Sequence, residues 1–311
     1  MSGFFVLIKH GIQEFIMDRE FKNLSPYSVK MYKTNLNEFH EFCVEESVVI
    51  IPDVTTSLVK KYLQYVKNER KNNEGTINNK IRSLKAFFTF LIEEEMINEK
   101  SNPMKRIKQI KEEIKIEVLS DNQVKMVLKH LDRQAIYNNR FIALRNRTIV
   151  IFLISTGVRR GELVNIKWSD VNFESYSIKV FGKKRQLASI PMSTKLKREL
   201  LEYRIYCEQF FGKLGDYVFC SQQNKKISKE AISSIFKKLH KELNFEGVRL
   251  SCHDFRHYFA SKAIQNGIDV MTLQRILRHE NIQMTQRYVN LWGTALQEQN
   301  EKYNPLNNLD I

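Results

Sequence analysis

Residues 149–162 read IVIFLISTGVRRGE, and this stretch decides how the C-terminal part of the chain is organised. Its first six residues are all apolar, which predicts the buried end of a helix over about residues 140–155. Gly157 is typical of the residue that ends a helix, because glycine adopts the left-handed conformation without strain. Arg159 and Glu162 then open a new element, which can present a guanidinium in a rigid pocket. Arginine suits bidentate contact with phosphate, so we interpret the stretch as a candidate anion site; a surface arginine beside a helix cap is the alternative.

The sequence around this stretch predicts a mainly helical domain. Ser120 is a typical N-cap for a helix that runs to about residue 131. Residues 176–181 (YSIKVF) alternate as in a strand, and residues 187–191 can pair with them across a turn at Gly182. The spacing of apolar residues from about 193 to 303 favours further helices. We therefore expect an α-rich domain over residues 117–291 with one small antiparallel β-sheet.

The first hundred residues predict a separate helical bundle. Ser25 and Pro26 are typical of a helix start, and apolar residues follow at helical spacing over about 26–44. Similar patterns predict helices over about 56–70 and after Thr76, with a short one over 9–18. The aromatic stripe of these helices is expected to form the core. We place a helical domain at 9–103, and a basic interdomain linker at 104–116.

Charge and cysteine content narrow the class of protein. The 311 residues carry a net charge of +15, of which +3 lies in residues 1–115 and +12 in the remainder. Such a balance favours a polyanionic partner, above all nucleic acid, with solubility as the alternative reason. The four cysteines form no metal-binding or CxxC spacing and are expected to be free thiols. The apolar run Phe4–Ile8 is too short to span a membrane and has no cleavage pattern. We expect a cytoplasmic protein with no membrane partner.

Further candidate residues follow the arginine stretch. Lys183 lies at the expected hairpin tip, His253 and Arg256 share one predicted helix, and His279 and Tyr288 come after them. Each is weak alone, since a turn lysine is usually solvated and a single tyrosine usually packs in a core. Together they supply what phosphodiester transesterification without metal or cofactor requires. Arginines neutralise the transition state, an acid protonates the leaving oxygen, and a tyrosine whose pKa is near 10 needs activating surroundings.

A metal site is the competing interpretation of one motif. His253 and His257 stand four apart, as in the HExxH pattern of zinc hydrolases, with Asp254 in place of glutamate. The sequence offers no convincing third ligand, so a metal-dependent hydrolase is the remoter alternative.

The order and spacing of these motifs resemble the tyrosine recombinase family, which includes phage integrases, Xer recombinases and transposon recombinases. That family shows T-G-x-R-x-x-E, a hairpin lysine, H-x-L-R, G-H and a tyrosine nine residues on. The resemblance covers about residues 9–290, and the first domain resembles the family's SAM-like core-binding domain. The positions that match the motifs are Arg159 with Glu162, Lys183, His253, Arg256, His279 and Tyr288.

The resemblance implies a site-specific recombinase that cuts and rejoins DNA through a 3′-phosphotyrosyl intermediate at Tyr288 and a Holliday junction. It implies that Arg159 and Arg256 hold the phosphate and that Lys183 is the general acid. It further implies that His253 assists proton transfer from the tyrosine and that His279 hydrogen-bonds the phosphate. Glu162 would order Arg159.

The resemblance also implies partners: double-stranded DNA with an inverted-repeat core site, a homotetramer on synapsed DNA, and accessory proteins. Residues 292–311 are expected to form a helix and tail that dock on a neighbouring protomer. The expected fold is mainly α, with a helical-bundle core-binding domain and an α-rich catalytic domain that contains a small antiparallel sheet.

Two positions depart from the family pattern: Phe255 replaces the usual leucine, and Arg278 replaces the usual glycine before His279. Three other functions stay open at this point. The chain could be a DNA-binding accessory protein with a vestigial site, the metal-dependent hydrolase above, or an enzyme that relaxes DNA like a type IB topoisomerase.

Overall fold

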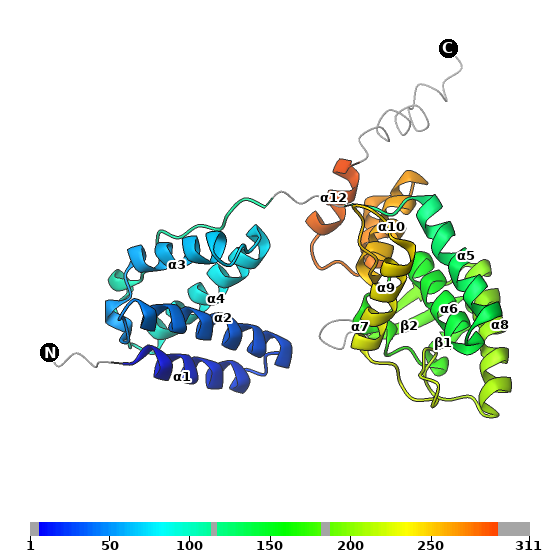
Figure 1. Ribbon diagram of the computed structural model, residues 1–311, viewed down its shortest axis with the longest axis horizontal. Helices are drawn as coiled ribbons and strands as arrows, with labels where there is room; N and C mark the ends of the chain where they lie inside the picture. The colour runs from blue at the N-terminus through cyan, green and yellow to red at the C-terminus, as the bar shows by residue number, and fades with distance from the viewer. Residues whose placement is uncertain (1–5, 113–116, 182–186, 292–311) are drawn as a thin grey trace, which may run out of the picture. The chain divides into compact units, whose positions relative to one another are not determined.

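The computed structural model of the chain describes residues 6–112, 117–181 and 187–291 (Figure 1). The chain divides into two compact units, Met1–Ile114 and Lys115–Ile311. Both are built mostly of helices, and the second contains a three-stranded antiparallel sheet. The mainly helical fold class with one small antiparallel sheet is therefore confirmed. No helix among the described residues is long and apolar enough to cross a membrane.

The described residues of the first unit form a bundle of four α-helices whose shared aromatic stripe makes up the core. Phe15, Phe39, Tyr62 and Phe87 are fully buried there, and Phe15 packs edge-on against Phe87. The α-helices of this unit are α1 (Ile8–Phe21), α2 (Pro26–Glu45), α3 (Thr56–Asn68) and α4 (Glu74–Glu93), with 3-10 turns at Ile51–Asp53 and Glu99–Ser101.

Three helix boundaries differ clearly from the sequence prediction: the start of α4, the end of α1, and the end of α5 (Asp121–Tyr137), which lies six residues beyond its predicted end at about 131. Helix α4 begins at Glu74 and not after Thr76, because the Asn73 side chain caps it and accepts a hydrogen bond from the Thr76 N–H at 2.9 Å. Helix α1 continues to Phe21, three residues beyond its predicted end at 18.

The described part of the expected linker packs on this first unit. Met104 and Ile107 are buried against the bundle, and the buried Asn78 amide exchanges two hydrogen bonds with the backbone of Ile110, both at 2.8 Å. Asn78 also donates to the carboxylate of Glu112. The apolar residues at 104, 107 and 110 explain this packing, because their spacing gives the segment one apolar side.

The second unit is organised around α6 (Arg140–Thr156), whose apolar run is buried as predicted except for the partly buried Ile154. Helices α5, α8 and α10 pack against it. Strands β2 and β3 pair antiparallel, with Ile178 opposite Ile190, and both side chains are buried. The remaining elements are α5 (Asp121–Tyr137), α7 (Arg160–Leu163), a 3-10 turn at Trp168–Asp170, β1 (Val171–Asn172), β2 (Ser177–Phe181), β3 (Leu187–Pro191), α8 (Thr194–Phe211), α9 (Lys229–Leu243), α10 (Cys252–Gln265), α11 (Val270–Leu277) and α12 (Gln283–Leu291).

The C-terminal end of α6 lies close to α10, and this places Arg159, two residues after Gly157, near α10. Gly157 ends α6 with φ of +58°, and a Cβ there would lie 2.6 Å from the Phe259 ring on α10. Glycine is required on both counts, for its backbone conformation and for the close approach of α10. The chain leaves this turn directly into Arg159, which is the N-cap of α7.

Candidate active site

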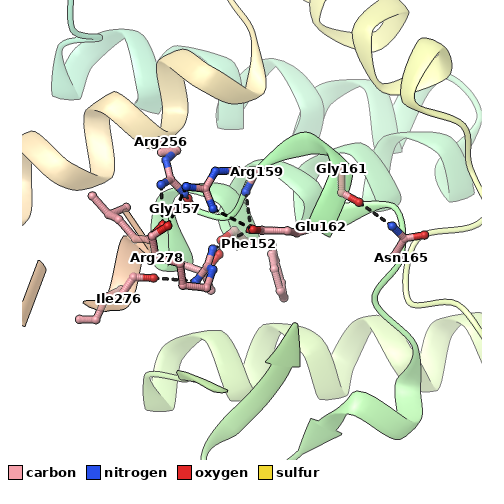
Figure 2. Close-up of polar contacts among 11 residues, drawn as sticks. Phe152, Gly157, Arg159, Gly161, Glu162, Asn165, Arg256, Ile276 and Arg278 are labelled. Atoms are coloured by element: carbon pink, nitrogen blue, oxygen red, sulfur yellow. Dashed lines mark hydrogen bonds and ion pairs between the residues drawn. The ribbon is translucent and has the colours of Figure 1, made fainter. Parts of the chain in front are cut away.

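Arg159 is fixed at the start of α7 by one carboxylate and one carbonyl. Its backbone N–H donates to Glu162 Oε2 at 2.9 Å, and its Nη1 donates to Glu162 Oε1 at 3.0 Å. Its Nη2 donates to the carbonyl oxygen of Arg278 at 2.8 Å (Figure 2). Its two contacts, with the Glu162 carboxylate and the Arg278 carbonyl, leave this partly exposed guanidinium little freedom, so it can present a fixed face to an anion.

Glu162 is the carboxylate that holds the side chains of Arg159 and Arg278. It is 5% exposed and accepts hydrogen bonds from Arg159 and Arg278. Burial alone would raise the pKa of Glu162, but the charge of Arg278 and the contacts with Arg159 outweigh it and lower that pKa. Glu162 is therefore ionised at neutral pH and neutralises one of the cations around it.

Arg256 is the most deeply buried cation of the site, at 2% exposure on α10. Its Nη1 donates to the carbonyl of Gly157 at 2.5 Å and its Nη2 to the carbonyl of Leu277 at 2.6 Å (Figure 2). Desolvation, followed by the charges of Arg159 and Arg278, lowers its pKa to about 9. It still carries its charge at neutral pH. Three guanidiniums thus surround one carboxylate, and the excess of positive charge favours an anion.

Arg278 occupies a backbone position that favours glycine. Its φ is +54°, in the left-handed region, which accounts for the glycine of the family pattern. Its side chain turns to Glu162, where Nη2 lies 2.6 Å from Oε2, and its Nη1 donates to the Ile276 carbonyl at 2.6 Å. The Nε of Arg278 is buried without a partner among the described residues. The departure from the pattern thus adds a third guanidinium to the site.

We expect an Arg278→Ala variant to lower the free energy of unfolding by about 1–3 kcal/mol, because it removes the largely buried bond to the Glu162 carboxylate. Arg278→Gly loses the same bond but relieves the left-handed backbone, so it should be about 1 kcal/mol more stable than Arg278→Ala. Urea unfolding of the three proteins measures both differences. An alanine variant as stable as the wild type would contradict the assigned ion pair.

His279 lies just beyond Arg278, and it is neutral. It is 8% exposed, and its Nδ1 lies 2.8 Å from the Oγ1 of Thr285 at the start of α12. Desolvation and the charges of Arg256, Arg159 and Arg278 lower its pKa to about 3. A neutral imidazole whose orientation is held by a hydroxyl can hydrogen-bond an anion without adding charge.

Tyr288 on α12 is 3% exposed, and its hydroxyl lies 2.6 Å from Nδ1 of His257 on α10. Burial raises the pKa of Tyr288, although the charges of Arg256 and Arg287 oppose that rise. His253 is exposed, and its ring stands edge-on to that of His257 with centroids 4.5 Å apart. Among the described residues, the side-chain hydrogen bond of the Tyr288 hydroxyl goes to His257 and none goes to His253.

The sequence places His257 on one helix face with His253 and Arg256, as a donor suited to an anion or as a metal ligand, and did not predict its contact with Tyr288. Its position one helical turn after His253 was the available signal, since residues four apart share a helix face. The structure brings Arg159, Glu162, Arg256, His279 and Tyr288 into one neighbourhood, with His253 at its exposed side. Lys183 lies outside the described residues.

A basic groove of about 810 Å³ adjoins this cluster on the side of α9. Its lining includes the basic side chains Arg159, Arg160, Lys229, Lys237 and Arg249. The residues that the structure describes contain no group of three or more potential metal-ligating side chains. Together, the site can hold an anion against two fixed guanidiniums, next to a buried tyrosine hydroxyl.

Comparison with known proteins identifies the family. Residues 117–292 match the model of the phage integrase family. The chain belongs to the phage integrase family. Residues 13–95 also match the N-terminal SAM-like domain of phage integrases.

This integrase-family chain is similar to curated recombinases over most of its length. It is 27% identical to tyrosine recombinase XerC of Anoxybacillus flavithermus, over 87% of this chain and 89% of the relative. It is 24% identical to tyrosine recombinase XerD of Oceanobacillus iheyensis, over 96% and 99%. Membership confirms the resemblance: the chain is a tyrosine recombinase, a family that carries out site-specific DNA recombination. The vestigial and metal-dependent alternatives are not favoured.

Solved structures show the same fold at low identity. A lambda integrase dimer bound to a COC′ core site gives a TM-score of 0.74 at 17% identity, covering 92% of this chain and 78% of that chain. The Tn1549 transposon integrase in complex with transposon right-end DNA gives 0.74 at 20% identity, covering 89% and 94%.

Proposed function

We propose that this recombinase cuts and rejoins DNA through a covalent bond between Tyr288 and a 3′-phosphate. The observation that carries the proposal is a buried tyrosine hydroxyl that contacts His257, the residue after Arg256 on α10, in a site with excess positive charge. A phosphodiester is the anion that such a site both holds and exposes to a nucleophile.

The reaction follows from this placement. Arg159 and Arg256 bind the non-bridging oxygens of the scissile phosphate and neutralise the charge that grows on them in the transition state. The Tyr288 oxygen attacks phosphorus, the bond to the 5′-oxygen breaks, and a 3′-phosphotyrosyl bond and a free 5′-hydroxyl result. Lys183 is our candidate for the acid that protonates the leaving oxygen. A 5′-hydroxyl from a second strand reverses these steps, and the phosphotyrosyl bond supplies the energy for rejoining.

The remaining site residues support this step. Glu162 holds Arg159 in place through both carboxylate oxygens. The neutral His279 donates a hydrogen bond to the phosphate, and His253, on the exposed side, assists proton transfer. No cofactor or metal enters this scheme.

The assembly is proposed from the similar structures, one of which is a lambda integrase tetramer bound to a Holliday junction. We propose that four copies of this chain synapse two double-stranded sites with inverted-repeat cores, with accessory proteins as further candidate partners. The proposed domains are a core-binding domain at 9–103, a linker at 104–116 and a catalytic domain at 117–291. Residues 292–311 lie outside the described residues, and their docking on a neighbouring protomer is part of this proposal. We place the protein in the cytoplasm with the DNA on which it acts.

A nicked suicide duplex tests the proposed chemistry, because its cleaved fragment diffuses away and traps the covalent complex. The duplex is built on the sequence that the protein selects from a random-sequence library. We expect a covalent adduct on a denaturing gel, formed equally well in EDTA. A vestigial site would give binding without adduct, and a metal-dependent hydrolase would give EDTA-sensitive cleavage without adduct. Relaxation of a supercoiled plasmid that lacks the selected site would favour topoisomerase-like activity.

A further inference from the structure

The nucleophile of the proposed reaction has a specific side-chain partner in the fold. The Tyr288 hydroxyl lies 2.6 Å from His257 Nδ1, across the packed helices α10 and α12. The phenol ring is held in this place by Ala260, Leu273 and Leu277, which are fully buried around it. The contact is therefore part of a packed core and not a chance meeting of two surface side chains.

The chemistry of the two groups determines which one donates the hydrogen bond and which one accepts it. A phenol must lose its proton when its oxygen bonds to phosphorus, and a neutral imidazole nitrogen is a suitable acceptor. Desolvation, and after it the charges of His253 and Arg256, lower the pKa of His257 to about 4, so the ring is neutral at physiological pH. With its proton on Nε2, Nδ1 presents a lone pair to the Tyr288 hydroxyl, which donates to it.

We propose that His257 is the proton acceptor of the nucleophile, holding the Tyr288 hydroxyl before attack and taking its proton during strand cleavage. The inference rests on the proposed function of Tyr288 and adds a residue to its mechanism. As the bond from the Tyr288 oxygen to phosphorus forms, the O–H bond breaks and the proton moves to His257 Nδ1, giving an imidazolium. When the strand is rejoined, the bond to phosphorus breaks and the imidazolium returns the proton to Tyr288.

The charges around His257 oppose the proton transfer from Tyr288 until a phosphate is bound. The titratable and charged groups that face His257 are His253 and Arg256 from its own helix and Tyr288 from α12. The charge of Arg256 disfavours a proton on His257, and burial raises the pKa of Tyr288 and keeps its phenol protonated. A bound phosphate pairs with Arg256, which removes part of the opposition and makes His257 a better base once substrate is in place.

His253 is less well placed for the same task. It is exposed, while Tyr288 is buried, and the ring of His257 lies beside it on the side of the tyrosine. The two histidines thus differ in position: His257 contacts the nucleophile, and His253 is exposed.

Two substitutions separate proton acceptance from positioning. In His257→Asn the amide oxygen stands close to where Nδ1 was, so it can hold the Tyr288 hydroxyl but cannot accept its proton. In His257→Phe both functions are lost. We expect both variants to bind the selected duplex normally and to form the covalent adduct about 10²-fold more slowly in single-turnover assays on the nicked suicide substrate. Tyr258→Phe, on the next residue of α10, is the matched control and should cleave at the wild-type rate.

The pH profile gives a readout that a structural role would not change. A base must be neutral, so wild-type cleavage should slow as pH falls through the pKa of His257 in the complex, and this loss should be absent in His257→Asn. An asparagine variant with the wild-type rate would overturn the proposal, as would an acid limb that remains in that variant at the same pH as in the wild type. These outcomes are read only after the wild type has formed its adduct at Tyr288. Failure of the wild type to do so would instead refute the proposed function.

A measurement without DNA tests the contact itself. In ¹⁵N-histidine NMR spectra, the Nδ1 resonance of His257 should be that of a neutral hydrogen-bonded acceptor and should shift in a Tyr288→Phe variant. An unchanged resonance in that variant would contradict the hydrogen bond from which the proposal starts.

Discussion

A Tyr288→Phe variant is expected to bind the selected duplex as tightly as the wild type and to form no covalent adduct. The substitution removes the attacking oxygen and leaves the ring that packs against Ala260 and Leu277. The lost hydrogen bond to His257 should cost about 1 kcal/mol of stability, too little to unfold the domain. Gel-shift and denaturing-gel assays on the same nicked duplex measure binding and adduct separately. An undiminished adduct would remove Tyr288 from its assigned role.

The second large effect is expected at Arg256. An Arg256→Lys variant should cleave at least about 10²–10³-fold more slowly, because a lysine cannot bind the carbonyls of Gly157 and Leu277 and also present a planar fork to phosphate. Binding to the duplex should change far less, since many phosphates contribute to it. Single-turnover cleavage at saturating protein measures the loss.

A matched control exists for the stability cost of that change. Arg145 on α6 is a second buried arginine, 8% exposed, and its Nη1 donates to the Cys220 carbonyl at 3.0 Å. Arg145→Lys should destabilise the fold in a similar way and leave cleavage per folded molecule unchanged. Equal cleavage losses in the two variants would mean that Arg256 acts through stability and not on the phosphate.

Local sequence signals predicted much of this structure. Ser25 with Pro26 marks the start of α2, and the apolar run before Gly157 marks the buried end of α6, because both depend on neighbours in the chain. The strands at 176–181 and 187–191 followed from their alternation. These features need no knowledge of the tertiary structure.

Long-range packing determined what the sequence could not predict. The bond between His257 and Tyr288 joins residues 31 apart and depends on how α10 meets α12. The hydrogen bond from Arg278 to Glu162 joins residues 116 apart in the sequence. The spacing of motifs alone could not show whether Arg278 binds a phosphate or a carboxylate. Similarly, the packing of Ile110 on Asn78 joins residues 32 apart and depends on how the bundle places α4.

The arginines of this site are anchored largely by backbone carbonyls, those of Gly157, Leu277 and Arg278. A carbonyl oxygen is present whatever side chain its residue carries, so the anchors survive amino-acid replacement as long as the backbone path is kept. Side chains such as those of Leu277 and Arg278 can therefore change in evolution while their carbonyls continue to hold the two arginines. The arginine at 278 illustrates this freedom: its side chain is new to the family pattern, while its backbone still supports Arg159. Insertions and deletions, in contrast, are the changes that such a site tolerates least.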